Sequence, residues 1–85
     1  MLVNKEILKK QIIYRSTHRG TKEMDLLLGD FVKKNINIFS DSELKDLENL
    51  MIIEDEILQK WYFEENNNEL IPINKVSQML KKFKI

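Results

Sequence analysis

The 85-residue sequence contains no cysteine, one proline, two glycines and a single histidine. The lack of cysteine excludes disulfides and thiolate metal sites, and it suits a reducing compartment. No apolar run approaches the roughly 20 residues that a membrane-spanning helix needs. Residues 1–3 are followed by the polar residues 4–6 before the hydrophobic region of a signal peptide develops. We therefore expect a bacterial cytoplasmic protein that does not insert into a membrane.

Catalytic machinery is equally sparse. The sequence has no cysteine nucleophile, no glycine-rich phosphate loop after a strand, and no triad-like set of histidine, serine and aspartate. His18 is the only imidazole, and no carboxylate cluster near it has the spacing of metal ligands. A chain of this length has room for one domain, residues 1–85, in which a cofactor-sized cavity would consume much of the core. We expect a binding module with no catalytic residue, no metal site and no stably bound cofactor.

Charges of the two signs balance, with 14 Lys and Arg against 14 Asp and Glu. The balance argues against a nucleic-acid binder, because phosphate binding relies on net positive charge. Along the chain the distribution is uneven: residues 1–39 and 66–85 are mainly basic, and residues 40–65 are mainly acidic. Two interpretations stay open, a solvated acidic helix pair between basic flanks and a docking surface with two signs of charge.

Apolar residues spaced three and four apart predict helices, and no stretch alternates with the period of a strand. A first helix is expected over residues 4–18 with Asn4 as its N-cap. Its apolar side is formed by Ile7, Leu8, Ile12 and Tyr14. A second helix is expected over residues 22–36 with Thr21 as its cap. Its apolar stripe consists of Met24, Leu27, Leu28, Phe31 and Val32.

The second half of the chain has the same helical character. Ser40 and Glu43 have the spacing of a capping box, which begins a third helix over residues 41–53. Residues 54–56 are acids suited to the N-terminus of a short fourth helix. The polar residues 64–69 are expected to form the longest loop.

A last helix follows that loop. Pro72 fits its first turn, and Asn74 is an equally good cap. Its apolar side is formed by Ile73, Val76, Leu80 and Phe83. We expect an all-α fold, a compact bundle of about five short helices in a single domain.

Glycine is scarce, and both glycines fall between residues 14 and 31, together with both arginines and the histidine. Gly20 separates the first two helices and can take the left-handed conformation that often closes a helix. Gly29 lies inside the second helix, which indicates close approach by another helix or by a partner. Arg19 and Glu23 flank the break on its polar side. We expect these polar ends to stay exposed while the apolar face of the segment is buried.

Two blocks of the sequence form a recognisable pair. The first begins Arg19-Gly20-x-x-Glu23 and continues Asp25-Leu26-Leu27-Leu28-Gly29-x-Phe31. The second is Leu50-Met51, then Asp55, then Trp61. Together the blocks, which span roughly residues 12–63, resemble the signature of the small succinate dehydrogenase assembly factors known as flavinators. The second block departs from the family's pattern, because Glu56 and Ile57 stand where the family has proline and aspartate.

The resemblance implies a function in flavoprotein assembly. Flavinators promote covalent attachment of FAD to the flavoprotein subunit of succinate dehydrogenase, and fumarate reductase is a further expected partner. The chain, monomeric when free, would dock on the immature flavoprotein, and the bond-forming chemistry would belong to FAD and the partner. The partner-binding residues that the resemblance implies are His18, Arg19, Gly20, Glu23, Asp25, Asp55 and Trp61.

The implied roles have a physical basis. Arg19 offers a planar fork to a carboxylate or carbonyl of the partner. Gly20 lets the partner's backbone approach closely, and Glu23 accepts hydrogen bonds from donors on the partner.

Each of these residues also has a purely structural interpretation, and the function has alternatives. Arg19, Gly20 and Glu23 would then form a helix cap with a surface ion pair, and Trp61 would belong to the core. The main alternative function is a small helical protein-binding regulator unrelated to flavinylation. A DNA-binding helix-turn-helix protein would need a basic recognition helix, whereas residues 22–36 carry as many acids as lysines. An enzyme is the least favoured class.

Overall fold

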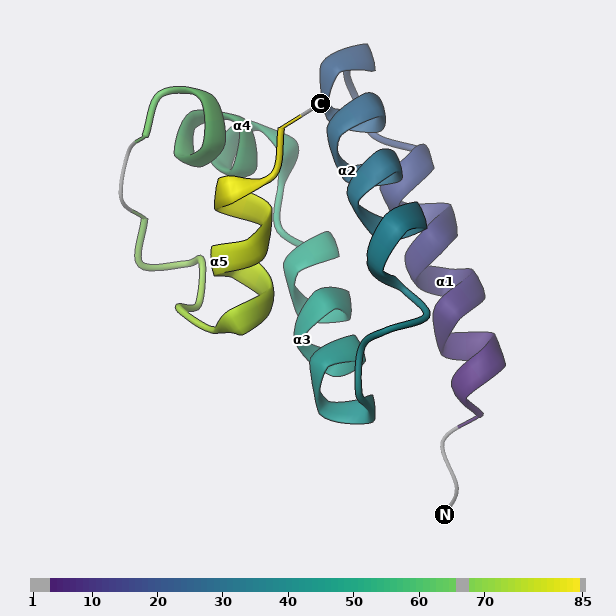
Figure 1. Ribbon diagram of the computed structural model, residues 1–85. Helices are drawn as coiled ribbons and strands as arrows, with labels where there is room; N and C mark the ends of the chain where they lie inside the picture. The colour runs from purple at the N-terminus through teal and green to yellow at the C-terminus, as the bar shows by residue number, and fades with distance from the viewer. Residues whose placement is uncertain (1–3, 66–67, 85) are drawn as a thin grey trace.

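The computed structural model describes residues 4–65 and 68–84. Within them the chain forms five helices and no strand, which confirms the predicted all-α class (Figure 1). The helices are α1 (Lys5–Thr17), α2 (Lys22–Asn35), α3 (Asp41–Met51), α4 (Asp55–Phe63) and α5 (Lys75–Lys82). Residues 1–3, used above for the signal-peptide expectation, and residues 66 and 67 of the predicted polar loop lie outside the described residues.

The helices pack in two connected groups. α1 and α2 form an antiparallel pair, and α1 also packs on α3. α5 packs on α3, so that Figure 1 shows α1 and α5 on opposite sides of α3. The turn between α1 and α2 therefore lies near the turn between α3 and α4. No helix of the described part of the chain has the length and apolar character that crossing a membrane requires.

Side-chain caps begin four of the helices, as the sequence predicts. The Asn4 side chain accepts hydrogen bonds from the first turn of α1, and Thr21 does the same for α2. Ser40 and Glu43 form the predicted capping box of α3. Asn74, not Pro72, begins α5, and its side chain accepts from the Ser77 backbone N–H at 2.9 Å. Each such cap is worth about 1 kcal/mol, which helps helices this short to form.

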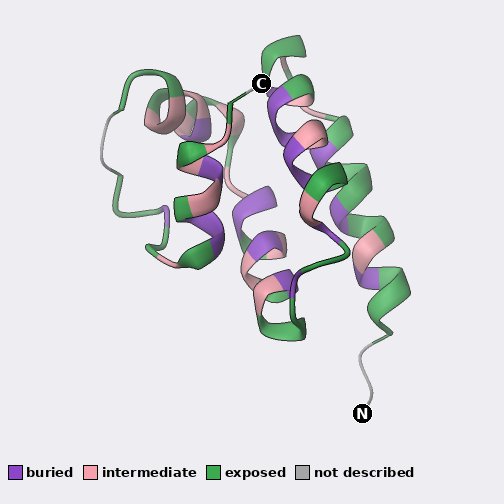
Figure 2. Ribbon diagram, in the orientation of Figure 1, coloured by how far each residue is buried: buried purple, intermediate pink, exposed green. Residues whose placement is uncertain are grey.

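One hydrophobic core joins all five helices. Figure 2 shows buried residues on each of the five helices. The predicted stripe of α2 is fully buried, with exposures of 0–1% from Met24 to Val32. α3 contributes Leu44, Leu47, Leu50 and Met51. Because interiors are close-packed, these contacts fix how the two interhelical turns face each other.

Three predicted core residues lie on the surface instead. Ile7 and Tyr14 are 53% and 62% exposed on α1, and Ile73 is 88% exposed just before α5. Only Leu8 and Ile12 of the predicted apolar side of α1 are buried. The assignment of Ile73 was wrong because α5 begins two residues later, at Lys75, which places Ile73 outside its periodicity.

Gly29 lies where α1 and α2 come close together. A Cβ built on Gly29 would lie 3.4 Å from the Thr17 Cγ2 atom and 3.8 Å from the Ser16 backbone oxygen. Ser16 is itself fully buried, and its hydroxyl donates to the Ile13 carbonyl at 2.8 Å. The close approach that the glycine predicts is thus made by α1 of the same chain.

Candidate functional site at the turn between α1 and α2

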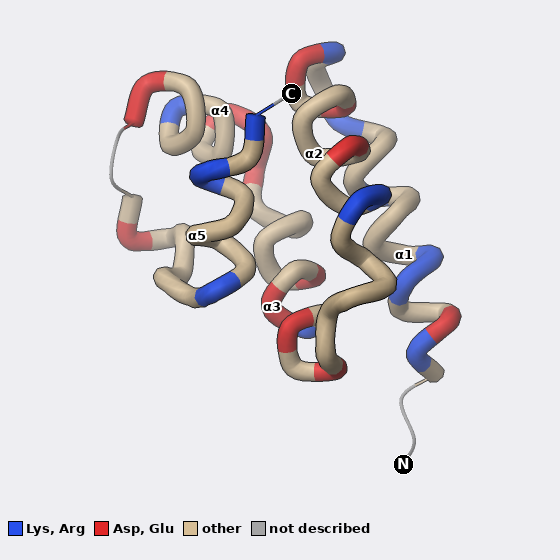
Figure 3. Tube along the Cα trace, in the orientation of Figure 1, with Lys and Arg blue, Asp and Glu red and all other residues tan. Residues whose placement is uncertain are grey.

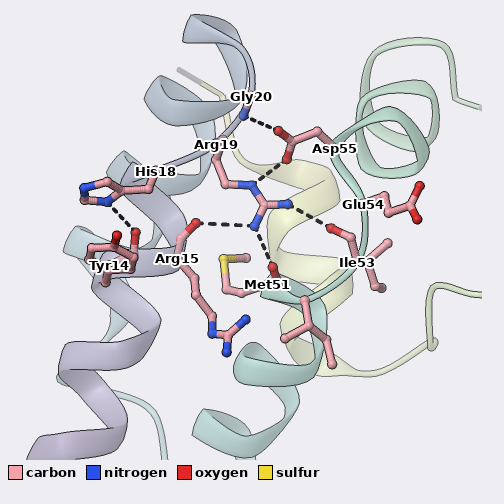
Figure 4. Close-up of a pocket in the computed structure, with 10 residues that line it drawn as sticks. Tyr14, Arg15, His18, Arg19, Gly20, Met51, Ile53, Glu54 and Asp55 are labelled. Atoms are coloured by element: carbon pink, nitrogen blue, oxygen red, sulfur yellow. Dashed lines mark hydrogen bonds and ion pairs between the residues drawn. The ribbon is translucent and has the colours of Figure 1, made fainter.

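The short segment from His18 to Thr21 connects two helices and holds three of the seven predicted site residues, namely His18, Arg19 and Gly20. α1 ends at Thr17 with His18 as its C-cap, and α2 begins at Lys22 after the Thr21 cap. Figure 4 shows this segment beside the α3–α4 turn, which runs from Met51 to Asp55. The fold thus brings the two blocks of the sequence resemblance together in space.

Arg19 points into the molecule and joins the two turns. Its Nε donates to Asp55 Oδ1 at 2.5 Å. Its Nη1 donates to the carbonyls of Met51 at 2.5 Å and Arg15 at 3.3 Å, and its Nη2 donates to the Ile53 carbonyl at 2.8 Å. These bonds are drawn in Figure 4. The sequence-based placement of Arg19 on an exposed polar side was therefore wrong, since its side chain is only 9% exposed.

Two carboxylates complete this arrangement. Asp55 Oδ2 accepts the Gly20 backbone N–H at 2.5 Å, so one carboxylate holds two successive residues. Asp25 Oδ1 accepts the Arg19 backbone N–H at 2.6 Å. We call Arg19, Gly20, Asp25 and Asp55 the clasp. Their bonds satisfy backbone groups that would otherwise lack partners at the ends of α1 and α3.

The structural role of the clasp follows from its burial. The Arg19–Asp55 pair joins residues 36 positions apart, and the Asp55 side chain is 20% exposed. Removing one member of a buried pair leaves the other charge without compensation, at a cost of roughly 3–5 kcal/mol for a fully buried pair. The planar guanidinium suits this position, because it donates to a carboxylate and several carbonyls at once. The clasp sets the relative position of the two turns.

Gly20 is required for a reason other than the one predicted. The described residues include no glycine with a positive φ, so the predicted left-handed cap at Gly20 was wrong. A Cβ at this position would instead lie 3.1 Å from Asp55 Oδ2, closer than most real Cβ contacts. The group that limits the space at Gly20 is therefore the Asp55 carboxylate, which also accepts the hydrogen bond from the Gly20 N–H.

Two predicted site residues do face outward. Glu23 is exposed in the first turn of α2 and makes no ion pair with any described residue, which excludes the alternative pair with Arg19. His18 is exposed and stacks on Tyr14, with ring centroids 3.9 Å apart. Its Nδ1 donates to the Tyr14 carbonyl at 2.8 Å, which leaves Nε2 directed away from Tyr14 (Figure 4). Among the predicted site residues, Glu23 and His18 are the two whose polar side chains are exposed.

Trp61 lies apart from this cluster. It is half-buried against the core on α4, where the Lys81 Nζ lies 4.6 Å above its ring centroid. With Ile71 and Pro72 it lines a separate hollow of 700 Å³. Glu56 and Ile57, the two residues that depart from the family pattern, lie in different environments. Glu56 is exposed and pairs with Lys60 at 3.4 Å, and Ile57 packs against the core.

An open hollow of 390 Å³ lies over the clasp, between the two turns. Its lining includes six residues that were not predicted as site residues, among them the exposed Tyr14, Arg15 and Ile52. Helical spacing was an available signal for two of them, because Tyr14 and Arg15 precede His18 and Arg19 by four residues. Ile52 is 58% exposed, and no sequence pattern distinguishes it from a core residue.

The charges have a clear arrangement. Figure 3 shows acidic residues concentrated on α3 and α4, and lysines and arginines on α1 and α5.

A hydrogen bond from the Ser40 backbone N–H, then one from Lys75, lowers the pKa of Glu43 below its ordinary value of 4.5. No group of three or more potential metal ligands gathers within residues 4–65 and 68–84.

Comparison with known proteins now adds its evidence. A family described as "Flavinator of succinate dehydrogenase" matches residues 10–84, which include both turns and the whole clasp. The chain belongs to this family.

Named relatives of this flavinator-family chain agree. It is 34% identical over 74 residues to "FAD assembly factor SdhE" of Acetobacter pasteurianus, covering 87% of this chain and 65% of that protein. It is 36% identical over 62 residues to "Succinate dehydrogenase assembly factor 2, mitochondrial" of Arabidopsis thaliana, covering 73% of this chain and 33% of that protein. The chain thus spans between one third and two thirds of these relatives. No solved structure matches the chain significantly.

Proposed function

We propose that this flavinator-family chain binds the immature flavoprotein subunit of succinate dehydrogenase and promotes covalent attachment of FAD to that subunit. The observation that carries the proposal is the family match over residues 10–84. The site agrees with it, because it brings Arg19 and Gly20 of the first block beside Met51 and Asp55 of the second. The homologous flavoprotein of fumarate reductase is included as a partner. The setting that we infer is the bacterial cytoplasm, with the free chain monomeric.

The chemistry in this proposal belongs to the flavoprotein and FAD. The exposed side chains are suited to recognition. At the hollow, Arg15 and His18 donate hydrogen bonds and Ile52 offers apolar area, and in the first turn of α2 Glu23 accepts hydrogen bonds. Holding the partner so that flavin and acceptor side chain are aligned is worth several kcal/mol of activation barrier. The chain supplies this orientation and holds no FAD of its own.

The clasp has an indirect part in this function. Arg19, Gly20, Asp25 and Asp55 use their polar atoms inside the chain, and they position the exposed residues around them. Changes in the clasp therefore affect docking through the geometry of the two turns. A test of the interface has to use the exposed residues.

The experiment is reconstitution of flavinylation from purified components. Apo-flavoprotein subunit and FAD are mixed with or without the chain, and covalent flavin is followed by its fluorescence on an acid-treated denaturing gel. We expect the chain to speed this reaction, and Glu23→Ala to slow it while thermal unfolding stays unchanged. The matched control is Glu64→Ala. It removes an exposed carboxylate at the C-cap of α4, whereas the candidate site lies at the N-terminal end of that helix.

The outcomes separate the proposals. Flavinylation at the same rate with and without the wild-type chain would refute the function. A normal rate with Glu23→Ala would leave the function standing and remove Glu23 from the interface.

A further inference from the structure

α1 has apolar residues on two opposite sides. Leu8 and Ile12 face the core, and Ile7 and Tyr14 lie on the outer side with more than half of their surface exposed. A surface helix with one partnered face normally keeps its other face polar. Contiguous exposed apolar area on a surface is typical of interaction sites.

This outer side of α1 is hollowed. Ile7, Lys10, Gln11, Tyr14 and Arg15 line a hollow of 520 Å³, and we call this surface the α1 groove. Ile7, Gln11, Tyr14 and His18 follow at spacings of four, three and four, which places them in one row along the helix. Tyr14 and Arg15 also line the hollow over the clasp, so the α1 groove continues the candidate site along α1.

The groove carries positive charge that the chain does not neutralise. Other lysines of α1 are paired: Lys5 with Asp41 at 3.2 Å and Lys9 with Glu6 at 3.9 Å. Lys10 and Arg15, the two cations of the groove, form no ion pair with any carboxylate of residues 4–65 and 68–84. Both are exposed. The groove therefore combines apolar contact area with two available cations.

We propose that the α1 groove binds an acidic segment of the flavoprotein that also carries an apolar side chain. This inference rests on the proposed function and extends its interface along α1 away from the clasp. Carboxylates of the segment pair with Lys10 and Arg15, and its apolar side chain packs between Ile7 and Tyr14. Charge-assisted bonds at exposed positions steer association and fix the register of the two surfaces.

Charge decides between this occupant and a second copy of the chain. A symmetric dimer through the α1 groove would place the same cations on both sides of the interface. Like charges facing each other across an interface oppose association. An acidic partner removes that conflict.

The test measures affinity between the full chain and the purified apo-flavoprotein subunit at low and high salt. In the variant Lys10→Glu/Arg15→Glu we expect the affinity at low salt to fall at least about tenfold, with a weaker dependence on salt, because both attractive charges become repulsive. The Arg15 carbonyl that contacts Arg19 is kept, since only side chains change.

The control carries the same change in charge on another element. Lys82→Glu/Lys84→Glu alters two exposed lysines at the end of α5 and just after it, and α5 packs on α3. We expect it to bind within about twofold of wild type, since only weak long-range charge effects remain. Circular dichroism verifies folding, and Lys10→Glu alone serves if the double variant unfolds.

A photo-crosslinking residue in place of Gln11 identifies the occupant. We expect a crosslink to a flavoprotein segment with net negative charge. A crosslink to a second copy of the chain, or to a segment without negative charge, would overturn the proposal. Equal affinity of the groove variant and the α5 control, with wild type binding well, would refute the groove and leave the proposed function intact. Absence of wild-type binding would refute the proposed function itself.

Discussion

At the scale of single residues, the most informative is Arg19, because its position in the fold changes the meaning of the sequence motif. Arg-Gly-x-x-Glu suggests a row of polar groups presented to a partner. In the structure the arginine and glycine of this motif bind Asp55 of the same chain, whereas the Glu23 side chain is exposed and makes no ion pair with a described residue. One short motif thus contains both positioning residues and a presented residue.

The first prediction separates these two kinds of residue by stability. Arg19→Ala should lower the free energy of unfolding by about 2–4 kcal/mol, since it leaves the partly buried Asp55 carboxylate and several carbonyls without a donor. Glu23→Ala should change it by less than about 0.5 kcal/mol, as exposed polar substitutions usually do. Urea denaturation measures both. Equal stabilities of the two variants would mean that the clasp contributes nothing to folding.

The second prediction concerns Gly20. An alanine Cβ 3.1 Å from Asp55 Oδ2 forces the carboxylate to shift, so Gly20→Ala should cost about 1 kcal/mol and Gly20→Val more. The cost should shrink in an Asp55→Ala background, because the crowded atom is then absent. A double-mutant cycle measures this coupling. Additive effects of the two substitutions would contradict the proposed contact.

At the scale of helices, the sequence predicts what local rules control. Caps such as Asn4 and Ser40 and the stripe of α2 depend on residues within a few positions of each other, and each was predicted correctly. The ends of α1, α2 and α3, the helices with predicted bounds, differ by at most two residues from the expected ones.

The sequence-based predictions are wrong where contacts between residues far apart in the sequence determine the burial of a side chain. Arg19 is buried because the end of α3 and the start of α4 lie beside it. The residues that it contacts there follow it by 32 to 36 positions in the sequence. Tyr14 is exposed because the core side of α1 is already filled by Leu8 and Ile12. No local pattern contains either fact.

The third prediction tests the crossing of α1 and α2. A Cβ at Gly29 meets Thr17 Cγ2 at 3.4 Å, an ordinary contact distance. Gly29→Ala should therefore stabilise the protein by up to about 1 kcal/mol through helix propensity. Gly29→Leu should destabilise it, since the longer side chain meets the backbone of α1. Thermal unfolding of both variants checks this, and a destabilised alanine variant would show that the helices are in closer contact.

The fourth prediction concerns the start of α3 and its dependence on pH. Because the pKa of Glu43 is lowered in the folded state, its contribution to stability is present above the unfolded pKa near 4.5 and is lost as pH falls through the folded value. Glu43→Gln keeps an acceptor for the Ser40 N–H but cannot titrate. Its unfolding free energy should depend less on pH below 4.5 than that of wild type. Urea denaturation across this range compares the two, and parallel curves would exclude a contribution of Glu43.

At the scale of the whole molecule, the structure separates folding from recognition. The core is filled by side chains such as Leu27, Leu28 and Leu44, each with no exposed surface. The polar clasp fixes two turns beside this core. The residues that we propose for recognition lie around these turns and along α1, where they are exposed and contribute little to the core.

The last prediction follows from that filled core. A flavin ring could enter only by displacing fully buried side chains, at several kcal/mol for each residue removed from the core. The purified chain should therefore be colourless, without stoichiometric FAD, in its absorption spectrum. In the reconstitution, covalent flavin should appear on the flavoprotein band and never on this chain. His18→Gln should keep most of the activity, because the proposed chemistry needs no imidazole from the chain. A fluorescent band at the mass of this chain would contradict the proposal that the chemistry belongs to the flavoprotein and FAD. Full loss of activity in His18→Gln with docking intact would contradict it as well.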